Sequence, residues 1–437
     1  MTSAAATLAD DLKSPEAGPV PNLQQGTAID KMLDFLADPS AKFFLLSGYA
    51  GTGKTFCIQH LIPKVRGRMI FTAPTNKATK VIRDSLSSSE FKAECRTIYS
   101  LLGLRLEANG EVKELAVPED PVDLSQYRAV IVDEASMINS LLFSFIRKTA
   151  DEQRIKFIFM GDSAQLPPVK ELRSPVWTAC DSVVELTQVM RYDNQILKLA
   201  TAMRKVVDHP APNINIASDN ADGEGIWRLS GTDFEAQLLK AADIGAFSEP
   251  NRAKAIAWRN ITVDALNKRI RARIFDNPEQ LWLPEDRVIL MEPAKDLNDE
   301  VQATTDDEGR VTSVEAVWHP TYGEFKCWRM SVTLDDGKPV SLWVLHEDFV
   351  AQAAARAEEL AAKARLNRRL WGTFWDFKDA FHKVRHAYAI TAHRAQGSTY
   401  DTAFVDWRDI LINRNRGEAF RCLYVACTRA KRRLIFN

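Results

Sequence analysis

The segment Gly48–Thr55 has the residue types of a phosphate-binding loop, because it fits the pattern G-x-x-x-x-G-K-S/T at every fixed position. Glycines let backbone N–H groups point at phosphate oxygens, and a following helix adds the positive end of its dipole. In this pattern Lys54 reaches the β and γ phosphates and the hydroxyl of Thr55 binds Mg²⁺. The alternative without a nucleotide-binding role is a glycine turn beside a surface lysine. The residues expected to contact the phosphates are Gly48, Ala50, Gly51, Thr52, Gly53, Lys54 and Thr55.

Two further apolar runs end in polar side chains. Asp133 and Glu134 follow the run 129–132, so we expect Asp133 to hold Mg²⁺ and Glu134 to act as the general base toward a water molecule. Acidic residues also gather at helix starts, which is the alternative. Gln165 follows the run 157–160 in a proline-rich loop. It is placed to touch the γ-phosphate or its water, although an ordinary turn is equally compatible with the residues.

The elements that must position these groups alternate between short apolar runs and amphipathic segments. Continuous apolar runs separated by helices are typical of a parallel sheet covered on both faces. The runs in the first half are 43–46, 69–71, 129–132 and 157–160. Residues 101–125 interrupt this rhythm and predict a β-hairpin, with Asn109 and Gly110 at its turn.

The second half repeats the alternation around an insertion. Buried-strand character appears at 255–258 and returns at 388–390, 403–405 and 434–436. Between them, residues 288–291, 313–318, 328–334 and 340–345 indicate a small antiparallel unit, followed by a helix over 351–370. We therefore predict an α/β protein with two parallel-sheet domains, each with an insertion. The expected divisions are a flexible lead-in at 1–21, a first domain at 22–180 with its hairpin at about 101–125, a second domain at 181–275 and 383–437, and an inserted unit at 276–382.

Composition narrows the class of protein. The chain has 437 residues, 46% hydrophobic, and a net charge of -1, which excludes a diffusely basic nucleic-acid binder. Six cysteines without C-x-x-C spacing favour a reducing compartment. No apolar run reaches the roughly 20 residues that span a bilayer. Residues 1–21 lack the pattern of a secretion signal. We expect an intracellular protein without membrane contact, in the cytosol of a bacterium or phage host.

The near-zero net charge hides two segments of the chain that have large charges of opposite sign. Residues 363–437 have a net charge of +10, whereas residues 276–362 have a net charge of -12. The basic block is expected to contact nucleic acid. The acidic block is either a solvated face or a surface that keeps nucleic acid away.

Taken in order, the motifs resemble those of superfamily 1 helicases, within them the RecD/Dda-like superfamily 1B group. Tyr99 stands where histidine is usual in the motif 97–100. The likeness covers nearly the whole chain from Gln25 onward. The motifs are 48–55, 73–78, 97–100, 133–136, 161–169, 186–191, 388–399 and 423–430.

The resemblance implies two RecA-like domains with ATP and Mg²⁺ between them. It places Gln25 at the adenine base, with a polar helix-start residue as the alternative. Arg191 and Arg429 would act as arginine fingers from the second domain. The implied catalytic residues are Lys54, Asp133, Glu134, Gln165, Arg191 and Arg429, and Gln165, Arg191, Gly397 and Arg429 join Gln25 and the loop as nucleotide-binding residues.

Candidate DNA contacts come from both domains. Polar groups at helix starts and strand exits suit phosphates, and aromatic rings among cations suit stacked bases. A buried aromatic helix face with wet basic residues explains the aromatic cluster equally well, and His393 is also compatible with a structural loop histidine. The candidates are Pro74, Thr75, Asn76, Lys77, Thr97, Tyr99, Trp371, Trp375, Thr391, His393, Arg394 and Ser398.

The resemblance further implies an SH3-like unit with a helical arm at 276–382 and a hairpin at 101–125 that acts as a pin at the duplex junction, unless it is a surface excursion without a role. The activity expected is ATP-dependent DNA unwinding with 5′ to 3′ movement by a monomer on single-stranded and forked DNA, with a single-stranded-DNA-binding protein or the replisome as candidate partners. An RNA or RNA/DNA helicase or a nucleoprotein remodeller would share the motor. Another P-loop NTPase would lack the distal arginines, and a degraded ATPase would need a broken catalytic position.

Overall fold

The computed structural model describes residues 20–87, 94–109, 111–116, 121–188, 195–208, 215–276, 278–296 and 300–437. The expected arginine finger Arg191 and most of the expected lead-in lie outside these residues.

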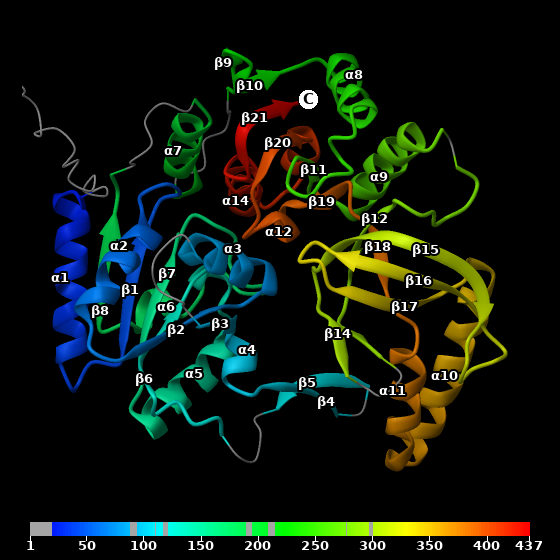
Figure 1. The fold of residues 1–437 in the computed structure, drawn as a ribbon, viewed down its shortest axis with the longest axis horizontal. Helices are drawn as coiled ribbons and strands as arrows, with labels where there is room; N and C mark the ends of the chain where they lie inside the picture. Colours follow the sequence, from blue (N-terminus) through cyan, green and yellow to red (C-terminus); the bar gives the residue numbers. More distant parts are fainter. Residues whose placement is uncertain are drawn as a thin grey trace, which may run out of the picture.

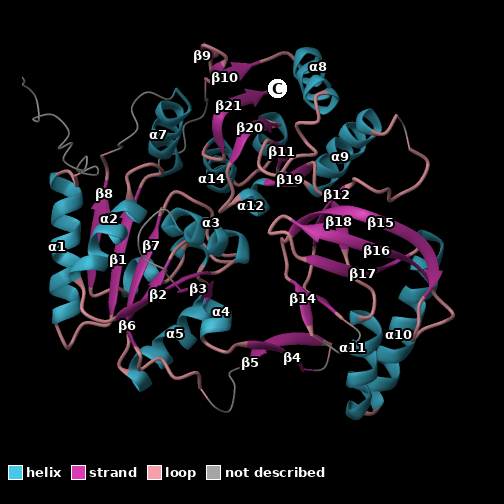
Figure 2. Cartoon of the chain, in the orientation of Figure 1, coloured by secondary structure: helices cyan, strands magenta, loops and turns pink. Residues whose placement is uncertain are grey.

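The first sheet has six strands in the order β3-β2-β6-β7-β1-β8, and all its pairs are parallel. Successive residues of a strand face opposite sides, so Phe44 packs with α1, α2 and α3 and Phe43 packs with α4 and α5. Helices thus cover both faces (Figure 2). The elements are α1 (Leu23–Ala37), β1 (Phe43–Gly48), α2 (Lys54–Leu61), η1 (Ile62–Lys64), β2 (Arg68–Ala73), α3 (Asn76–Ser87), β3 (Glu94–Thr97), α4 (Ile98–Leu101), β6 (Tyr127–Val132), η2 (Ala135–Met137), α5 (Ser140–Gln153), β7 (Lys156–Gly161), α6 (Val176–Ala179) and β8 (Ser182–Leu186).

The second sheet has the order β19-β11-β20-β21-β10-β9 and is parallel except for the β9–β10 pair. Helices α8 and α9 pack on one face, and α7, α13 and α14 pack on the other. The elements are α7 (Gln195–Asp208), β9 (Asp219–Ala221), β10 (Glu224–Arg228), α8 (Gly231–Asp243), β11 (Ala253–Ala257), α9 (Asn260–Ile274), β19 (Ala389–Thr391), α12 (Ala392–Ala395), β20 (Tyr400–Val405), α13 (Trp407–Leu411), α14 (Arg416–Cys427) and β21 (Ala430–Phe436). The predicted α/β class is confirmed.

Two antiparallel units extend from these sheets. Strands β4 (Arg105–Asn109) and β5 (Val112–Ala116) pair as the expected hairpin. A five-stranded sheet has the order β17-β16-β15-β12-β18. Its elements and neighbours are β12 (Arg287–Leu290), β13 (Ala294–Lys295), β14 (Val301–Ala303), β15 (Glu308–Trp318), β16 (Lys326–Leu334), β17 (Pro339–Leu345), η3 (Glu347–Phe349), α10 (Val350–Leu366), η4 (Arg368–Leu370), α11 (Trp371–Asp379) and β18 (Val384–His386).

The helical arm formed by α10 and α11 returns to the hairpin of the first domain (Figure 1). Helix α11 lies against β4. Arg365 near the end of α10 forms an ion pair with Glu111 at the hairpin turn. The hairpin is therefore braced from the inserted unit, although the two are more than two hundred residues apart in sequence.

Two strand pairings and one helix cap correct three expected boundaries. A division between residues 180 and 181 would cut β8 from the first sheet, where it pairs with β1. Ending the inserted unit at residue 382 would exclude β18, which pairs with β12. The helix expected over 351–370 ends at Leu366, and Asn367 then caps a separate 3-10 turn. In each case a partner distant in sequence, or a capping side chain, decides the boundary.

A buried ion pair attaches the inserted unit to the second domain. The guanidinium of Arg271 on α9 donates to both carboxylate oxygens of Asp286, at 2.7 and 2.9 Å. The hydroxyl of Tyr388 donates to the same carboxylate at 2.9 Å. Asp286 is fully buried, and burial would raise its pKa, but the partners His386 and Arg271 hold the pKa below its usual value.

We predict that Asp286→Ala lowers the free energy of unfolding by about 3–5 kcal/mol, because it leaves the Arg271 charge buried without its partner. Urea unfolding followed by circular dichroism measures the change. The matched control is Asp243→Ala, which breaks an equally bidentate but exposed pair with Arg273 on the same helix. Similar losses in both variants would contradict the importance of burial.

Candidate nucleotide site and nucleic-acid interface

The loop between β1 and α2 has the backbone of a phosphate cradle. Gly51 and Gly53 adopt left-handed conformations with φ of +78° and +83°, which favour glycine. A methyl group on Gly53 would lie 2.5 Å from Nε2 of Gln25. The amino group of Lys54 donates to the carbonyls of Gly48 and Tyr49 at 2.8 and 3.1 Å. The Lys54 ammonium group therefore lies against the backbone of its own loop.

Gln25 serves the protein itself with both ends of its amide. Its Oε1 accepts from the backbone N–H of Asn22 at 3.0 Å, which completes a capping box at the start of α1. Its Nε2 donates to the carbonyl of Thr52 at 3.1 Å. Gln25 is therefore a buried helix-start residue that supports the phosphate loop. A contact with adenine stays a prediction and would require Gln25 to exchange one of these bonds.

The acidic pair lies at the carboxyl end of β6. The backbone N–H of Glu134 donates to the Asp133 carboxylate at 2.8 Å, and Glu134 has a left-handed φ of +53°. Such strain at a non-glycine residue is typical of functional sites. Burial raises the pKa of Asp133. Burial and then the Asp133 charge raise the pKa of Glu134 to about 7, against the opposing charges of Arg429 and Lys54. This environment suits a general base.

A side-chain relay connects the acidic pair to the second domain. Nε2 of Gln396 donates to the hydroxyl of Ser136 at 2.9 Å and to Oε1 of Gln165 at 3.1 Å. Gln396 and Gln165 are both buried. The structure thus brings the predicted Gln165 to the domain interface, and it adds Gln396 as the partner from the segment after α12.

Arg429 also lies at this interface. Its Nε donates to the carbonyl of Val425 at 3.0 Å, and one Nη donates to the carbonyl of Ser398 at 2.9 Å. Burial lowers the pKa of the Arg429 guanidinium, and the nearby Glu134 carboxylate acts in the opposite direction. Gly397 has a φ of +74°. A methyl group there would meet the side chain of Ala78 at 3.4 Å, so this loop lies close to α3.

The motif 161–169 contains the carboxylate that joins the two domains, but the sequence assigned no role to it. Asp162 follows β7, is fully buried, and accepts from Nε of Arg204 at 3.2 Å and from the hydroxyl of Tyr424. The Arg204 guanidinium lies 3.9 Å from the ring centre of Tyr49 in the phosphate loop. Arg421 on α14 donates to the Gln165 carbonyl at 3.1 Å. Tyr424 lies within the motif 423–430, and Arg421 lies two residues before that motif begins.

Three predicted DNA contacts already bind protein groups. They contact the segment Thr304–Glu308 between β14 and β15, which we call the acidic loop. Nδ2 of Asn76 donates to the Thr304 hydroxyl, and Nζ of Lys77 donates to Glu308 at 2.9 Å. Arg394 forms an ion pair with Asp306. Burial would lower the pKa of Lys77, but Glu308 raises it above its usual value, so the cation stays charged.

The remaining DNA candidates divide between capping, core and surface positions. The hydroxyls of Thr75, Thr97 and Thr391 cap the starts of α3, α4 and α12, accepting from backbone N–H groups. Pro74 is buried, and Tyr99 packs against the hydrophobic core between the first sheet and helices α4 and α5. Oγ of Ser398 is buried and has no hydrogen-bond partner among the described residues.

The aromatic cluster on α11 combines the two alternatives expected from the sequence, which are a buried packing face and accessible rings that suit stacked bases. Phe374 and Phe377 are buried, whereas Trp371 and Trp375 are partly exposed. The ring of Trp375 packs against Phe374 with centroids 5.0 Å apart, and Nζ of Lys378 lies 4.9 Å from the Trp375 ring centre. The helix therefore buries one aromatic face and leaves two tryptophans accessible on the arm.

Comparisons with known proteins agree with this geometry. Residues 22–220 match the model of an AAA domain, and residues 386–436 match that of a UvrD-like helicase C-terminal domain. The ATP-dependent DNA helicase dda of Enterobacteria phage T4 is 28% identical over 88% of this chain and 92% of its own. Uncharacterized protein R530 of Acanthamoeba polyphaga mimivirus is 23% identical over 95% of this chain and 99% of its own.

Solved structures show the same fold. A Bacteroides Pif1 helicase in complex with ADP-AlF3 and single-stranded DNA has a TM-score of 0.51 at 18% identity, covering 94% of this chain and 91% of its own. A Pif1 helicase from a study of unwinding at forked duplex DNA also has a TM-score of 0.51, at 17% identity, covering 95% of this chain and 92% of its own.

A phosphate loop, an acidic pair and a buried arginine at the junction of two RecA-like sheets are an arrangement typical of superfamily 1 helicases. Together with the similarity to dda and the two family-model matches, this arrangement supports a superfamily 1B helicase related to Dda. The predicted fold class is confirmed by the two parallel sheets and by the Pif1 neighbours. The roles of individual residues stay predictions.

We predict that Asp306→Asn strengthens binding of single-stranded DNA by about fivefold, because a partly buried ion pair worth about 1 kcal/mol no longer competes for Arg394. Asparagine tolerates the left-handed φ of +69° at this position. Fluorescence anisotropy with a labelled oligonucleotide measures the affinity. Glu285→Gln, which removes the same charge from an exposed pair with Arg310, is the control. Unchanged or weaker binding by Asp306→Asn would contradict the competition.

Proposed function

We propose that this protein hydrolyses ATP to move 5′ to 3′ along single-stranded DNA and to unwind forked duplexes. The observation that carries the proposal is the meeting of Lys54, Glu134 and Arg429 at one interface between the two sheets. The similarity to the T4 DNA helicase dda over most of both chains supports DNA as the substrate, and the direction of movement follows from the resemblance to superfamily 1B helicases.

The residues around the phosphate loop fit a nucleotide with Mg²⁺. The hydroxyl of Thr55 and the carboxylate of Asp133 are oxygen donors of the kind that Mg²⁺ prefers, and bound Mg²⁺ would offset phosphate charge. Lys54 would exchange its loop carbonyls for phosphate oxygens. Glu134, with its raised pKa, would accept the proton of the attacking water. Arg429 would stabilise the charge that develops during hydrolysis.

The same contacts would couple hydrolysis to movement. The Gln165–Gln396 hydrogen bond crosses the interface beside the acidic pair. Gln396 follows Arg394 by two residues, so a shift at the nucleotide would reach a predicted DNA contact over a short path. Asn76 and Lys77 lie on the first domain, and Arg394 lies on the second. Alternating strength of these two grips would advance the strand.

We further propose that the hairpin separates the duplex at the fork. Its brace from α11 and the Glu111–Arg365 pair would hold it rigid against the load. Melting the DNA duplex costs on the order of 1.4 kcal/mol per base-pair step. A hairpin that bends under this load would yield instead of separating the base pairs. A division into two motor domains, a hairpin and an inserted unit belongs to this proposal, with the boundaries corrected by the strand pairings.

Substrate and partner assignments follow from this activity. Single-stranded and forked DNA are the proposed substrates, with a monomer as the active unit and a single-stranded-DNA-binding protein or replisome as partners. We also propose that the protein acts in the cytosol of a bacterial or phage-infected cell. Among the helices that the structure describes, none is long and apolar enough to cross a membrane.

We predict that Lys54→Ala abolishes DNA-stimulated ATP hydrolysis and unwinding, because the phosphates lose their central cation. The wild-type protein should unwind duplexes with a 5′ single-stranded tail and leave those with a 3′ tail intact. Lys64→Ala, a lysine just beyond α2, is the control. Unwinding by Lys54→Ala would refute the motor, and unwinding of 3′-tailed duplexes alone would refute the direction.

A second prediction separates the hairpin from the motor. Arg365→Glu should lower the rate of duplex unwinding severalfold while DNA-stimulated ATP hydrolysis stays near the wild-type rate, because the variant loses the brace to Glu111 and an ion pair to Glu358 within α10 but no contact at the nucleotide. The double variant Glu111→Arg with Arg365→Glu should restore unwinding. The control is Arg356→Glu on the same helix, whose partner Glu359 is internal to α10. Equal losses in both single variants would contradict the brace.

A further inference from the structure

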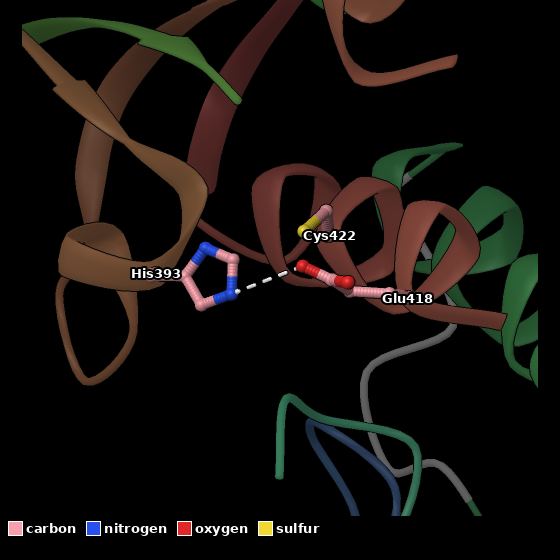
Figure 3. Close-up of side chains that lie close together, drawn as sticks. All are labelled: His393, Glu418 and Cys422. Carbon is pink, nitrogen blue, oxygen red and sulfur yellow. Dashed lines mark ion pairs between the residues drawn. The ribbon is translucent and has the colours of Figure 1, made fainter. Parts of the chain in front are cut away.

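Three side chains with metal-binding atoms converge beside the DNA-facing segment of the second domain. His393 comes from α12, and Glu418 and Cys422 come from consecutive turns of α14 (Figure 3). One potential ligand atom of each lies within 4.8 Å of the other two. Within the described part of the chain, no other group of three such residues converges in this way.

The spacing of these side-chain atoms suits coordination of a metal ion better than a direct hydrogen bond between them. Nε2 of His393 lies 3.7 Å from Oε1 of Glu418, which is too long for a hydrogen bond. Zinc bonds of about 2.0–2.3 Å in a tetrahedral arrangement separate neighbouring ligand atoms by about 3.3–3.8 Å. The observed separation therefore matches two ligands around one ion.

We propose that His393, Glu418 and Cys422 form a zinc-binding site. Nitrogen, oxygen and sulfur donors together favour Zn²⁺ over Mg²⁺ or Ca²⁺. Cys422 closes the buried end, and the partly exposed His393 and Glu418 leave a path from solvent. Three protein ligands leave a fourth position for water.

Binding would change the protonation of the thiol. Burial raises the pKa of Cys422, so the metal-free side chain is a protonated thiol. Coordination forms a zinc–sulfur bond, breaks the S–H bond and releases one proton to solvent, with no change in oxidation state. Burial of the thiol also keeps it from reacting with oxidants when the metal is absent.

The site would fasten two functional segments to each other. Helix α12 leads into Gln396 and Gly397, and α14 carries Arg421 and Tyr424 before Arg429. A metal between them would hold the DNA-facing loop at a fixed distance from the helix that contacts the phosphate loop. The metal site itself follows from the cluster and does not depend on the proposed helicase activity.

Cobalt titration of the full-length, metal-stripped protein tests the proposal. Co²⁺ is the probe, because thiolate coordination gives a charge-transfer absorption that carboxylate and imidazole sites lack. We expect one equivalent to produce this band and one equivalent of Zn²⁺ to remove it. No band at stoichiometric Co²⁺ would overturn the proposal.

Matched variants locate the site. Cys422→Ser should lose the charge-transfer band, and Glu418→Gln should weaken binding by at least about tenfold. Cys427→Ser is the control, because Cys427 is an equally buried thiol on the same helix but lies outside the cluster. A band that persists in Cys422→Ser, or that disappears equally in Cys427→Ser, would refute the assignment. Glu418→Gln keeps the test decisive if Cys422→Ser does not fold.

Discussion

The structure depends on one buried carboxylate. Asp162 has no solvent contact, and an unpaired charge in such a position would cost several kcal/mol. Its partners, Arg204 and Tyr424, both come from the other domain. The carboxyl edge of the first sheet must therefore face the second domain, where Arg429 directly precedes β21, and this places the phosphate loop, the acidic pair and Arg429 around one interface. Because Arg204 also lies on the Tyr49 ring, this single pairing involves the phosphate loop directly.

Local chemistry was predictable from the sequence, and long-range pairing was not. The phosphate loop and the acidic pair follow from short patterns in which neighbouring residues supply the constraint. The hairpin was also predictable, because Asn109 and Gly110 specify a tight turn. The place of β8 next to β1, the partners of Asp162 and the brace at Glu111 each join residues far apart in the chain. No single-sequence pattern encodes which of several similar acids or strands is selected.

The charge blocks acquire a different meaning in three dimensions. As a sequence feature, the acidic block at 276–362 suggests a solvated face or a repelling surface. In the structure, two of its acids, Asp286 and Glu308, are buried, and Glu308 binds Lys77 and Lys254 at 2.9 and 2.7 Å. Both lysines come from outside the block. The opposite charges are therefore partly complementary inside the molecule, and the inserted unit is held against both motor domains by ion pairs.

The acidic loop also affects how the protein responds to its ionic surroundings. Phosphate contacts normally release the cations condensed on DNA, which makes affinity fall steeply as salt increases. Here, Lys77 and Arg394 begin with carboxylate partners. A DNA strand that takes these two cations, as proposed, would displace acids of the protein, and those acids would recruit solvent cations of their own. The uptake and release of ions would then partly cancel, so DNA binding would be less sensitive to salt than the number of basic residues implies.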